Sequence, residues 1–198
     1  FEMPQEGFAL PDASPQDWRQ RDYGLPCVTL DLGVHVHHMM EYLVNGGGFD
    51  PVATTSGSFG KIPDVLDTVN VIGWSRSKKV MLSSMWTKAA LGNTNGLKFR
   101  LFGTKGSVEW HQGRPEELNY TDQSGLRMTI ERGHPMLIEA NKPRYNRFKA
   151  GHPAGFLEAF ANVYRDFHEA FMSPKSEHPV YGIEMALRGL ADLHQIHK

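Results

Sequence analysis

The sequence predicts an α+β fold, in which a large, mainly antiparallel, open β-sheet carries helices packed on one face. Residues 51–132 contain short runs of mixed apolar and polar residues, separated by turns rich in Gly, Asn and Ser. Such runs are typical of consecutive strands joined by short links, which pair in antiparallel fashion. A helical stretch precedes this region, and two long amphipathic stretches follow it. This order of elements predicts a sheet that helices cover.

Composition limits the function classes. The chain has 198 residues, of which 40% are hydrophobic, so it can bury a sizeable core as one domain or as one domain with an arm. A formal net charge of −1 gives no reason to expect a nucleic-acid partner or a membrane partner. No apolar run approaches the roughly 18 residues that span a bilayer. The single cysteine, Cys27, fits a reducing compartment, hence a cytoplasmic location, and is expected to be small and buried.

The chain divides into an arm and a body. Residues 1–30 are rich in Pro, Asp and Gln, and we expect them to form an irregular arm that carries Trp18 and Arg19. Residues 31–198 are expected to form the α+β body. The chain does not begin with Met, so we expect it to be a piece of a longer protein.

Periodicity and turn residues define the elements. Residues 33–45 are predicted to be helical, because their apolar residues recur at helical spacing and Asn45-Gly46-Gly47-Gly48 ends the run. Further helices are predicted at 154–172, which Ser173-Pro174 ends, and at about 180–197. The strands are predicted at residues 52–56, 66–74, 80–88, 97–102, 107–110, 117–121 and 127–131. The helix at 154–172 is expected to bury an apolar side made of Phe156, Leu157, Phe160, Val163, Tyr164, Phe167, Ala170 and Phe171.

The strands carry more large apolar residues than one layer of helices can cover. Successive side chains of a strand point to opposite faces, so these residues cannot all face the helices. An uncovered apolar face of that size is an aggregation hazard on a monomer. We therefore expect a homo-oligomer, a dimer or tetramer, that buries the open face of the sheet. The residues in question are Trp74, Met81, Met85, Trp86, Phe99, Leu101 and Trp110.

Asp31 and His35 are the candidate catalytic residues. They lie four positions apart at the predicted start of a helix, which puts both side chains on one face. A carboxylate can orient an imidazole and raise its basicity, and a positioned imidazole is the usual general acid or base near neutral pH. The alternative is that Asp31 is a favourable charge at a helix N-terminus and His35 a solvated side chain.

Other polar clusters favour structural interpretations. The spacing of His35, His37 and His38 does not put all three on one helical face, so no metal site is predicted. The turn at residues 103–107 is expected to be a hairpin and not a phosphate loop. The polar run at residues 144–147 is expected to lie in a solvated loop.

The order of these motifs resembles a known family. Asp-Leu-Gly-Val-His at 31–35 is followed by Phe-Gly-Thr-Lys-Gly-Ser-Val-Glu at 102–109, Phe-Leu-Glu-Ala-Phe at 156–160 and Leu-Arg-Gly-Leu at 187–190. This order is similar to the C-terminal domain of the glucose–fructose oxidoreductase, inositol dehydrogenase and MocA-like family (Gfo/Idh/MocA). The resemblance covers nearly the whole chain. It implies a fold like the C-terminal domain of dihydrodipicolinate reductase.

The resemblance also implies a function. Such enzymes use NAD or NADP, bound mainly by a Rossmann domain, to oxidise or reduce a hydroxyl of a sugar, cyclitol or related polyol. The glycine-rich fingerprint of that domain and its Glu-Lys-Pro motif are absent from residues 1–198, and Lys142 lies in a loop that does not match the motif. Asp31 and His35 match the family's acid/base pair. Trp18, Arg19 and His152 are candidate substrate-binding residues.

The main expectation is that the chain is the substrate-binding and oligomerisation half of such an enzyme, inactive alone. One alternative is that it is part of a non-catalytic sugar-sensing regulator of the same fold. A metal-dependent hydrolase that uses the histidine run is a third possibility, which a metal assay discriminates. The cofactor-binding residues of the enzyme are expected to lie mainly outside this sequence.

Overall fold

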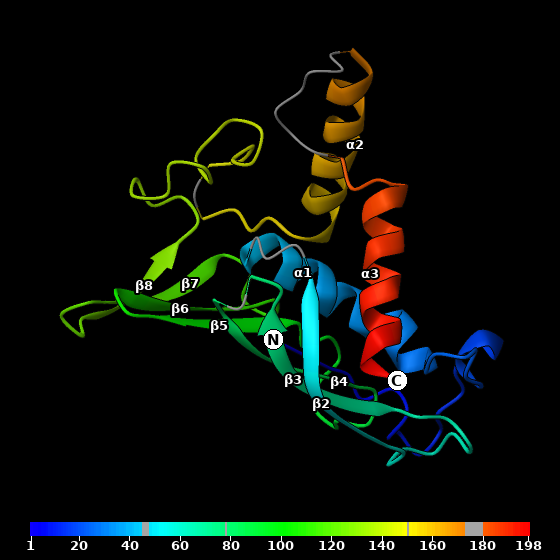
Figure 1. Ribbon diagram of the computed structural model, residues 1–198. Helices are drawn as coiled ribbons and strands as arrows, with labels where there is room; N and C mark the ends of the chain where they lie inside the picture. Colours follow the sequence, from blue (N-terminus) through cyan, green and yellow to red (C-terminus); the bar gives the residue numbers. More distant parts are fainter. Residues whose placement is uncertain (45–47, 78, 150, 173–179) are drawn as a thin grey trace. The chain divides into compact units, whose positions relative to one another are not determined.

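The structure, a computed structural model, describes residues 1–44, 48–77, 79–149, 151–172 and 180–198 (Figure 1). Hydrogen bonds join eight strands into one sheet in the order β2-β3-β4-β1-β5-β6-β7-β8. The pairs β1–β5, β2–β3, β3–β4, β6–β7 and β7–β8 are antiparallel, and the pair β1–β4 is parallel. The predicted α+β class with a mainly antiparallel open sheet is confirmed. Contacts divide the chain into two compact units, residues 1–99 with 183–198, and residues 100–182.

The first unit contains the strands β1 (Glu2–Pro4), β2 (Phe49–Gly57), β3 (Thr68–Ser75), β4 (Met81–Thr87) and the start of β5 (Lys98–Gly103). The helices α1 (Val34–Val44) and α3 (Ile183–Ile196) belong to the same unit. The predicted elements 33–45, 52–56, 66–74, 80–88, 97–102 and 180–197 agree with these bounds to within a few residues. The helix was predicted to end at residues 45–48, of which residues 45–47 lie outside the described part of the chain.

Alternation separates the two faces of β3 and β4. On one face, Val69 lies opposite Trp86 and Val71 lies opposite Ser84, and all four are buried. On the other face, Trp74 lies opposite Met81, and their side chains are 38% and 73% exposed. Opposite faces of one strand therefore differ in burial, as the period of two requires.

The core of the first unit lies between this buried sheet face and the two helices (Figure 1). Val36 and Met40 of α1 and Leu193 and Ile196 of α3 pack in the same cluster as the buried residues of β3 and β4. Both helices therefore cover the same face of these strands. Within the described chain, this cluster is the larger of two apolar cores; the smaller consists of Phe8, Cys27 and Val65.

The expected irregular arm at residues 1–30 is more ordered than the sequence indicates. Residues 2–4 form β1, which inserts between β4 and β5. Asp17–Arg19 form a 3₁₀ turn, and a helical segment begins at Cys27 and continues through a π turn at Thr29–Gly33 into α1. A strand of three residues is too short for a visible period, and its pairing with β4 joins positions more than 80 residues apart.

The second unit contains β6 (Gly106–His111), β7 (Glu117–Asp122), β8 (Arg127–Glu131) and α2 (Phe156–Met172). The three strands form consecutive antiparallel pairs, and the turn at residues 103–107 joins β5 to β6 as a hairpin, as predicted. Ion pairs order the loop after β8. Arg132 Nε lies 2.7 Å from Glu116 Oε2, and the buried Arg144 bonds to Asp166 and Glu169 of α2.

Two expectations about this unit are wrong. Arg144 is not part of a solvated loop, because its two carboxylate partners on α2 draw it out of solvent. Helix α2 is strongly amphipathic, yet none of its residues is buried, and Phe160, Phe167 and Phe171 are 48%, 44% and 86% exposed. Amphipathicity indicates which face of a helix needs cover, but the cover has to come from another surface. The predicted stop at Ser173-Pro174 lies outside the described residues.

Candidate functional site

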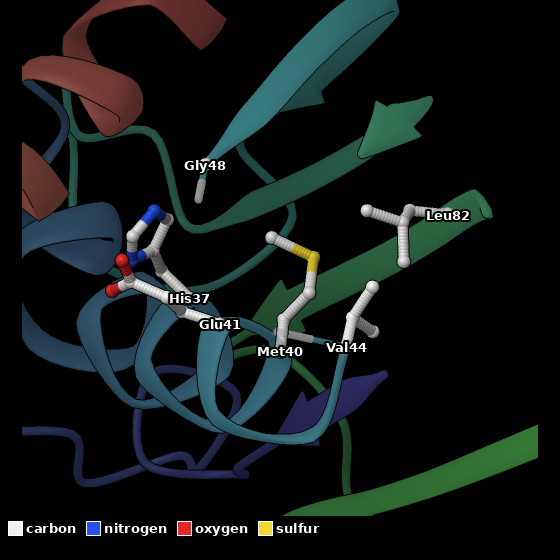
Figure 2. Close-up of a pocket in the computed structure, with 6 residues that line it drawn as sticks. All are labelled: His37, Met40, Glu41, Val44, Gly48 and Leu82. Atoms are coloured by element: carbon white, nitrogen blue, oxygen red, sulfur yellow. The ribbon is translucent and has the colours of Figure 1, made fainter. Parts of the chain in front are cut away.

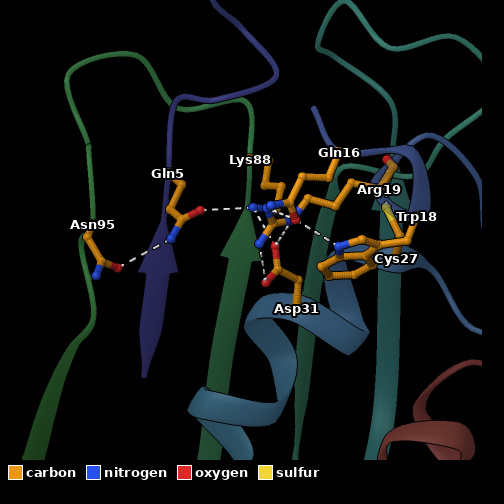
Figure 3. Close-up of polar contacts among 8 residues, drawn as sticks. All are labelled: Gln5, Gln16, Trp18, Arg19, Cys27, Asp31, Lys88 and Asn95. Atoms are coloured by element: carbon orange, nitrogen blue, oxygen red, sulfur yellow. Dashed lines mark hydrogen bonds and ion pairs between the residues drawn. The ribbon is translucent and has the colours of Figure 1, made fainter. Parts of the chain in front are cut away.

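The site is built around the carboxylate of Asp31, which lies inside the π turn that precedes α1. Arg19 Nε donates to Asp31 Oδ2 at 2.7 Å, and Arg19 Nη2 donates to Asp31 Oδ1 at 3.0 Å. Lys88 Nζ lies 2.6 Å from Asp31 Oδ2. Figure 3 shows the two cations converging on the one carboxylate. Charge-assisted and bidentate contacts of this kind hold a carboxylate in one orientation.

Arg19 reaches Asp31 from the 3₁₀ turn of the arm. Its guanidinium carbon lies 4.6 Å from the centre of the Trp18 ring, and its Nη1 donates to Gln16 Oε1 at 3.1 Å. The Trp18 indole donates to the same Gln16 oxygen at 2.9 Å, and its side chain is 39% exposed. The arm therefore presents an arginine and an aromatic ring beside Asp31. That this pair binds substrate stays a prediction.

Two contacts hold the π turn, one from β4 and one from the residue that follows α3. Trp86 Nε1 donates to Thr29 Oγ1 at 3.0 Å, and Thr29 Oγ1 lies 2.9 Å from His197 Nε2. Gly33 lies so close to Trp86 that an added Cβ would meet the indole at 3.1 Å. The glycine of the Asp-Leu-Gly-Val-His motif thus lets the helix approach the sheet. Wide turns of this type are rare and frequently occur at functional sites.

The charge state of Asp31 follows from its partners. Burial by itself would raise the pKa of the Asp31 carboxyl, but hydrogen bonds from Arg19 and Lys88, with their positive charges, outweigh it and lower that pKa below its usual value. Asp31 is therefore ionised at neutral pH. A fixed carboxylate can orient a proton donor or accept a hydrogen bond, but it does not itself carry the proton there.

His35 lies in the first turn of α1 and is exposed. Within the described residues its ring makes no hydrogen bond, and the bonds of Asp31 go to Arg19 and Lys88. Asp31 therefore does not orient His35 directly in this structure. The insertion of the π turn changes the rotation per residue between the two positions, so the rule for residues four apart does not apply. An exposed imidazole is available for proton exchange.

The other histidines of α1 have different settings. His37 is buried, and Figure 2 shows it with Met40 and Glu41 at a small pocket under α1. Burial lowers the pKa of His38. Within the described residues, no group of three or more His, Cys, Asp or Glu side chains is arranged to hold a metal ion.

His152 lies in the second unit, in the loop before α2, and is exposed. Its Nδ1 lies 3.0 Å from the carbonyl oxygen of Lys149, and its own carbonyl accepts from Arg132 Nη2 at 3.3 Å. The role of His152 in substrate binding stays a prediction.

Sequence reasoning missed Lys88, Trp86, Thr29 and His197. Lys88, Trp86 and His197 lie far from Asp31 along the chain, whereas Thr29 lies two residues before it in the same turn. None of the four belongs to a motif that marks it. A lysine after a strand normally indicates a solvated side chain, whereas Lys88 is buried here.

None of the helices in the described residues is long and apolar enough to cross a membrane.

The chain matches a family of known proteins. The family described as "Oxidoreductase family, C-terminal alpha/beta domain" (GFO_IDH_MocA_C) matches residues 6–186. The chain is 30% identical over 170 residues to the uncharacterized oxidoreductase YfiI of Bacillus subtilis, covering 81% of this chain and 42% of that protein. This chain therefore spans less than half the length of that relative.

Solved structures share the fold. An oxidoreductase from Sinorhizobium meliloti is 25% identical with a TM-score of 0.79, covering 99% of this chain and 52% of that one. A levoglucosan dehydrogenase solved with NADH and levoglucosan is 24% identical with a TM-score of 0.73, covering 99% and 54%. An inositol dehydrogenase homolog from Azotobacter vinelandii, solved with NADH and myo-inositol, is 21% identical with a TM-score of 0.65, covering 99% and 51%. The match over residues 6–186 shows that this chain belongs to the Gfo/Idh/MocA oxidoreductase family, as its C-terminal alpha/beta domain.

Proposed function

We propose that this chain is the substrate-binding and oligomerisation half of an NAD(P)-dependent oxidoreductase. The whole enzyme transfers hydride between a hydroxyl-bearing carbon of a sugar, cyclitol or related polyol and nicotinamide. The observation that carries the proposal is the Asp31 carboxylate, held ionised by Arg19 and Lys88 directly before an exposed His35. Structural relatives solved with levoglucosan or myo-inositol support the substrate class.

The described residues do not fit a dinucleotide. Pyrophosphate binds where a strand leads through a glycine-rich turn into a helix N-terminus. In the described part of this chain, α1, α2 and α3 are each separated from the preceding strand by a long segment or by another helix. We therefore place the NAD or NADP site mainly outside this chain and assign only substrate binding and proton exchange to its residues.

In this proposal, His35 exchanges the proton of the substrate hydroxyl. When the alcohol is oxidised, the hydroxyl oxygen gives its proton to the neutral imidazole and becomes a carbonyl oxygen. When the carbonyl is reduced, the imidazolium returns the proton. Asp31, fixed by Arg19 and Lys88, accepts a hydrogen bond from the substrate, and Trp18 and Arg19 contact the substrate.

The same proposal includes assembly and location. The open face at Trp74 and Met81 forms the contact between subunits of a homo-oligomer, and the enzyme is cytoplasmic. A non-catalytic sugar-sensing regulator is the second candidate, because the same fold and the same polar residues can bind a polyol without turning it over. The presence of both Asp31 and an exposed His35 favours the enzyme.

A screen of the full-length protein tests the function. Purified protein is mixed with NAD or NADP and a panel of sugars, cyclitols and polyols, and reduced nicotinamide is followed by absorbance. We expect turnover with at least one polyol, and none with residues 1–198 alone. Binding of a polyol by calorimetry without any turnover would support the regulator instead.

A further inference from the structure

Lys88 is a lysine in an unusual position. It follows β4 directly, and its side chain is 6% exposed, which makes it the one buried lysine in the part of the chain that the structure describes. Removing an ammonium from water is costly unless it gains an opposite charge and hydrogen bonds. Lys88 gains both, because its Nζ lies 2.6 Å from Asp31 Oδ2 and donates to Gln5 Oε1 at 2.9 Å.

The surroundings of Lys88 hold its ammonium in one place. The Gln5 amide nitrogen donates to Asn95 Oδ1 at 3.3 Å, which turns its oxygen toward Lys88. The Phe8 ring centre lies 5.5 Å from Lys88 Nζ, and the Phe8 N–H donates to the Lys88 carbonyl at 2.8 Å. The Lys88 N–H donates to the Asp67 carbonyl at 2.9 Å. The backbone on both sides of Lys88 is therefore fixed by the sheet and the arm.

The two cations on Asp31 differ in rigidity. Arg19 comes from a short 3₁₀ turn, and its side chain is 28% exposed. Lys88 comes from the end of a central strand and is nearly inaccessible. Arg19 is thus the partner that an entering ligand can reach, whereas Lys88 holds the carboxylate from the protein side.

We propose that Lys88 is a positioning residue, which fixes the orientation and the negative charge of Asp31 during proton exchange at His35. The inference rests on the proposed function. Among the described residues, the other titratable groups around Asp31 are Arg19 and the Cys27 thiol. Asp22 lies next to Cys27, and Asp22 Oδ1 accepts from the Cys27 N–H at 2.7 Å. Without Lys88, only the half-buried Arg19 holds the carboxylate, which becomes easier to protonate and to rotate.

Carboxyl titration tests the charge role in this chain without any activity. The pKa of the Asp31 side chain is measured by carbon NMR in wild type, Lys88→Met, Lys88→Arg and a control, Lys98→Met. Lys98 also forms an ion pair on a strand, at 2.9 Å from Glu2 Oε2, but away from Asp31. We expect the pKa of Asp31 to rise in Lys88→Met, to return toward wild type in Lys88→Arg and to stay unchanged in Lys98→Met.

Kinetics of the full-length protein test the positioning role. We expect Lys88→Met to lower kcat on the order of 100-fold, with little change in KM, because a misplaced reacting group costs about that much. The acid limb of its pH profile should move to higher pH, and Lys88→Arg should recover most of the rate.

Unchanged Asp31 titration or an unchanged pH profile in Lys88→Met overturns the inference. If Lys88→Met does not fold, Lys88→Gln replaces it, because glutamine keeps a hydrogen-bond donor and removes only the charge. A full-length protein without dehydrogenase activity contradicts the proposed function, while the titration still decides whether Lys88 controls Asp31.

Discussion

The Nε2 atom of His37 lies 3.0 Å from Oδ2 of Asp192, although the two residues are 155 positions apart in the chain. Their side chains are 3% and 1% exposed, and Arg76 donates to the other oxygen of Asp192. Burial by itself would raise the pKa of Asp192, but hydrogen bonds from His37 and Arg76 lower it below its usual value. This buried group ties α1, which carries the candidate acid/base residue, to α3.

Asp192→Asn is expected to destabilise the fold by about 3–5 kcal/mol, because it removes the buried negative charge that His37 and Arg76 contact. Since the folded pKa of Asp192 is depressed, its contribution is present above the ordinary carboxyl pKa and is lost as pH falls through the folded pKa. Urea unfolding at neutral and at acidic pH measures both effects.

The matched control for Asp192 is Glu117→Gln. Glu117 forms an exposed ion pair with Arg114 at 3.9 Å, so the expected loss is under about 1 kcal/mol. Equal losses in the two variants, or an Asp192→Asn loss independent of pH, would show that the buried group does not hold α1 to α3.

His35→Ala in the full-length protein is expected to lower turnover by roughly 10²–10⁴-fold, the usual contribution of a general acid or base. Cofactor affinity should change little. His194→Ala provides the control, because His194 is also an exposed histidine on a helix. Steady-state kinetics across pH decide the assignment, and unchanged turnover in His35→Ala removes it.

The Cys27 thiol is expected to be unreactive in the folded protein. Burial, followed by the charge of Asp22, raises its pKa from 9.0 to about 11, so the thiol is protonated at neutral pH. Alkylation by iodoacetamide should be slow in the native chain and fast in urea, with mass spectrometry as the readout. Because the folded pKa is raised, the thiol stabilises the fold below about pH 9, and this contribution disappears as pH rises through about 11. Rapid native alkylation would contradict this prediction.

Residues 1–198 alone are expected to bind NAD and NADP very weakly. The described residues lack a strand that leads through a glycine-rich turn into a helix, which is where pyrophosphate binds. Calorimetric titration with each dinucleotide is the measurement, with the full-length protein as the positive control. Micromolar or tighter binding by residues 1–198 would place the cofactor site within this chain.

The chain is expected to self-associate through the open face of β3 and β4. Trp74 and Met81 lie opposite each other on that face and are exposed in the single chain. Met81→Lys should favour the monomer without unfolding, because a lysine in an apolar contact is costly to desolvate. Tyr42→Lys on α1, where the side chain is 81% exposed, is the control. Sedimentation at several micromolar concentrations decides it, and a wild-type monomer at all of them refutes the interface.

Local patterns determined most of the elements. The alternation at residues 68–75 and 81–87 and the helical spacing at residues 34–44 are visible in the sequence, because each reports the period of its own backbone. The candidate catalytic motif was visible for the same reason, since Asp31, Gly33 and His35 lie within five consecutive positions. Their chemical roles still stay predictions.

Only the tertiary structure shows which side chains the candidate site residues contact. Nothing near Asp31 in the sequence indicates that Lys88 binds it, or that His37 is buried against Asp192 while His35 faces solvent. The sequence likewise did not predict the short strand β1 or the exposure of the apolar side of α2. A local period shows which face of a segment is apolar or charged, but its contacts depend on the register and packing of segments that are distant along the chain.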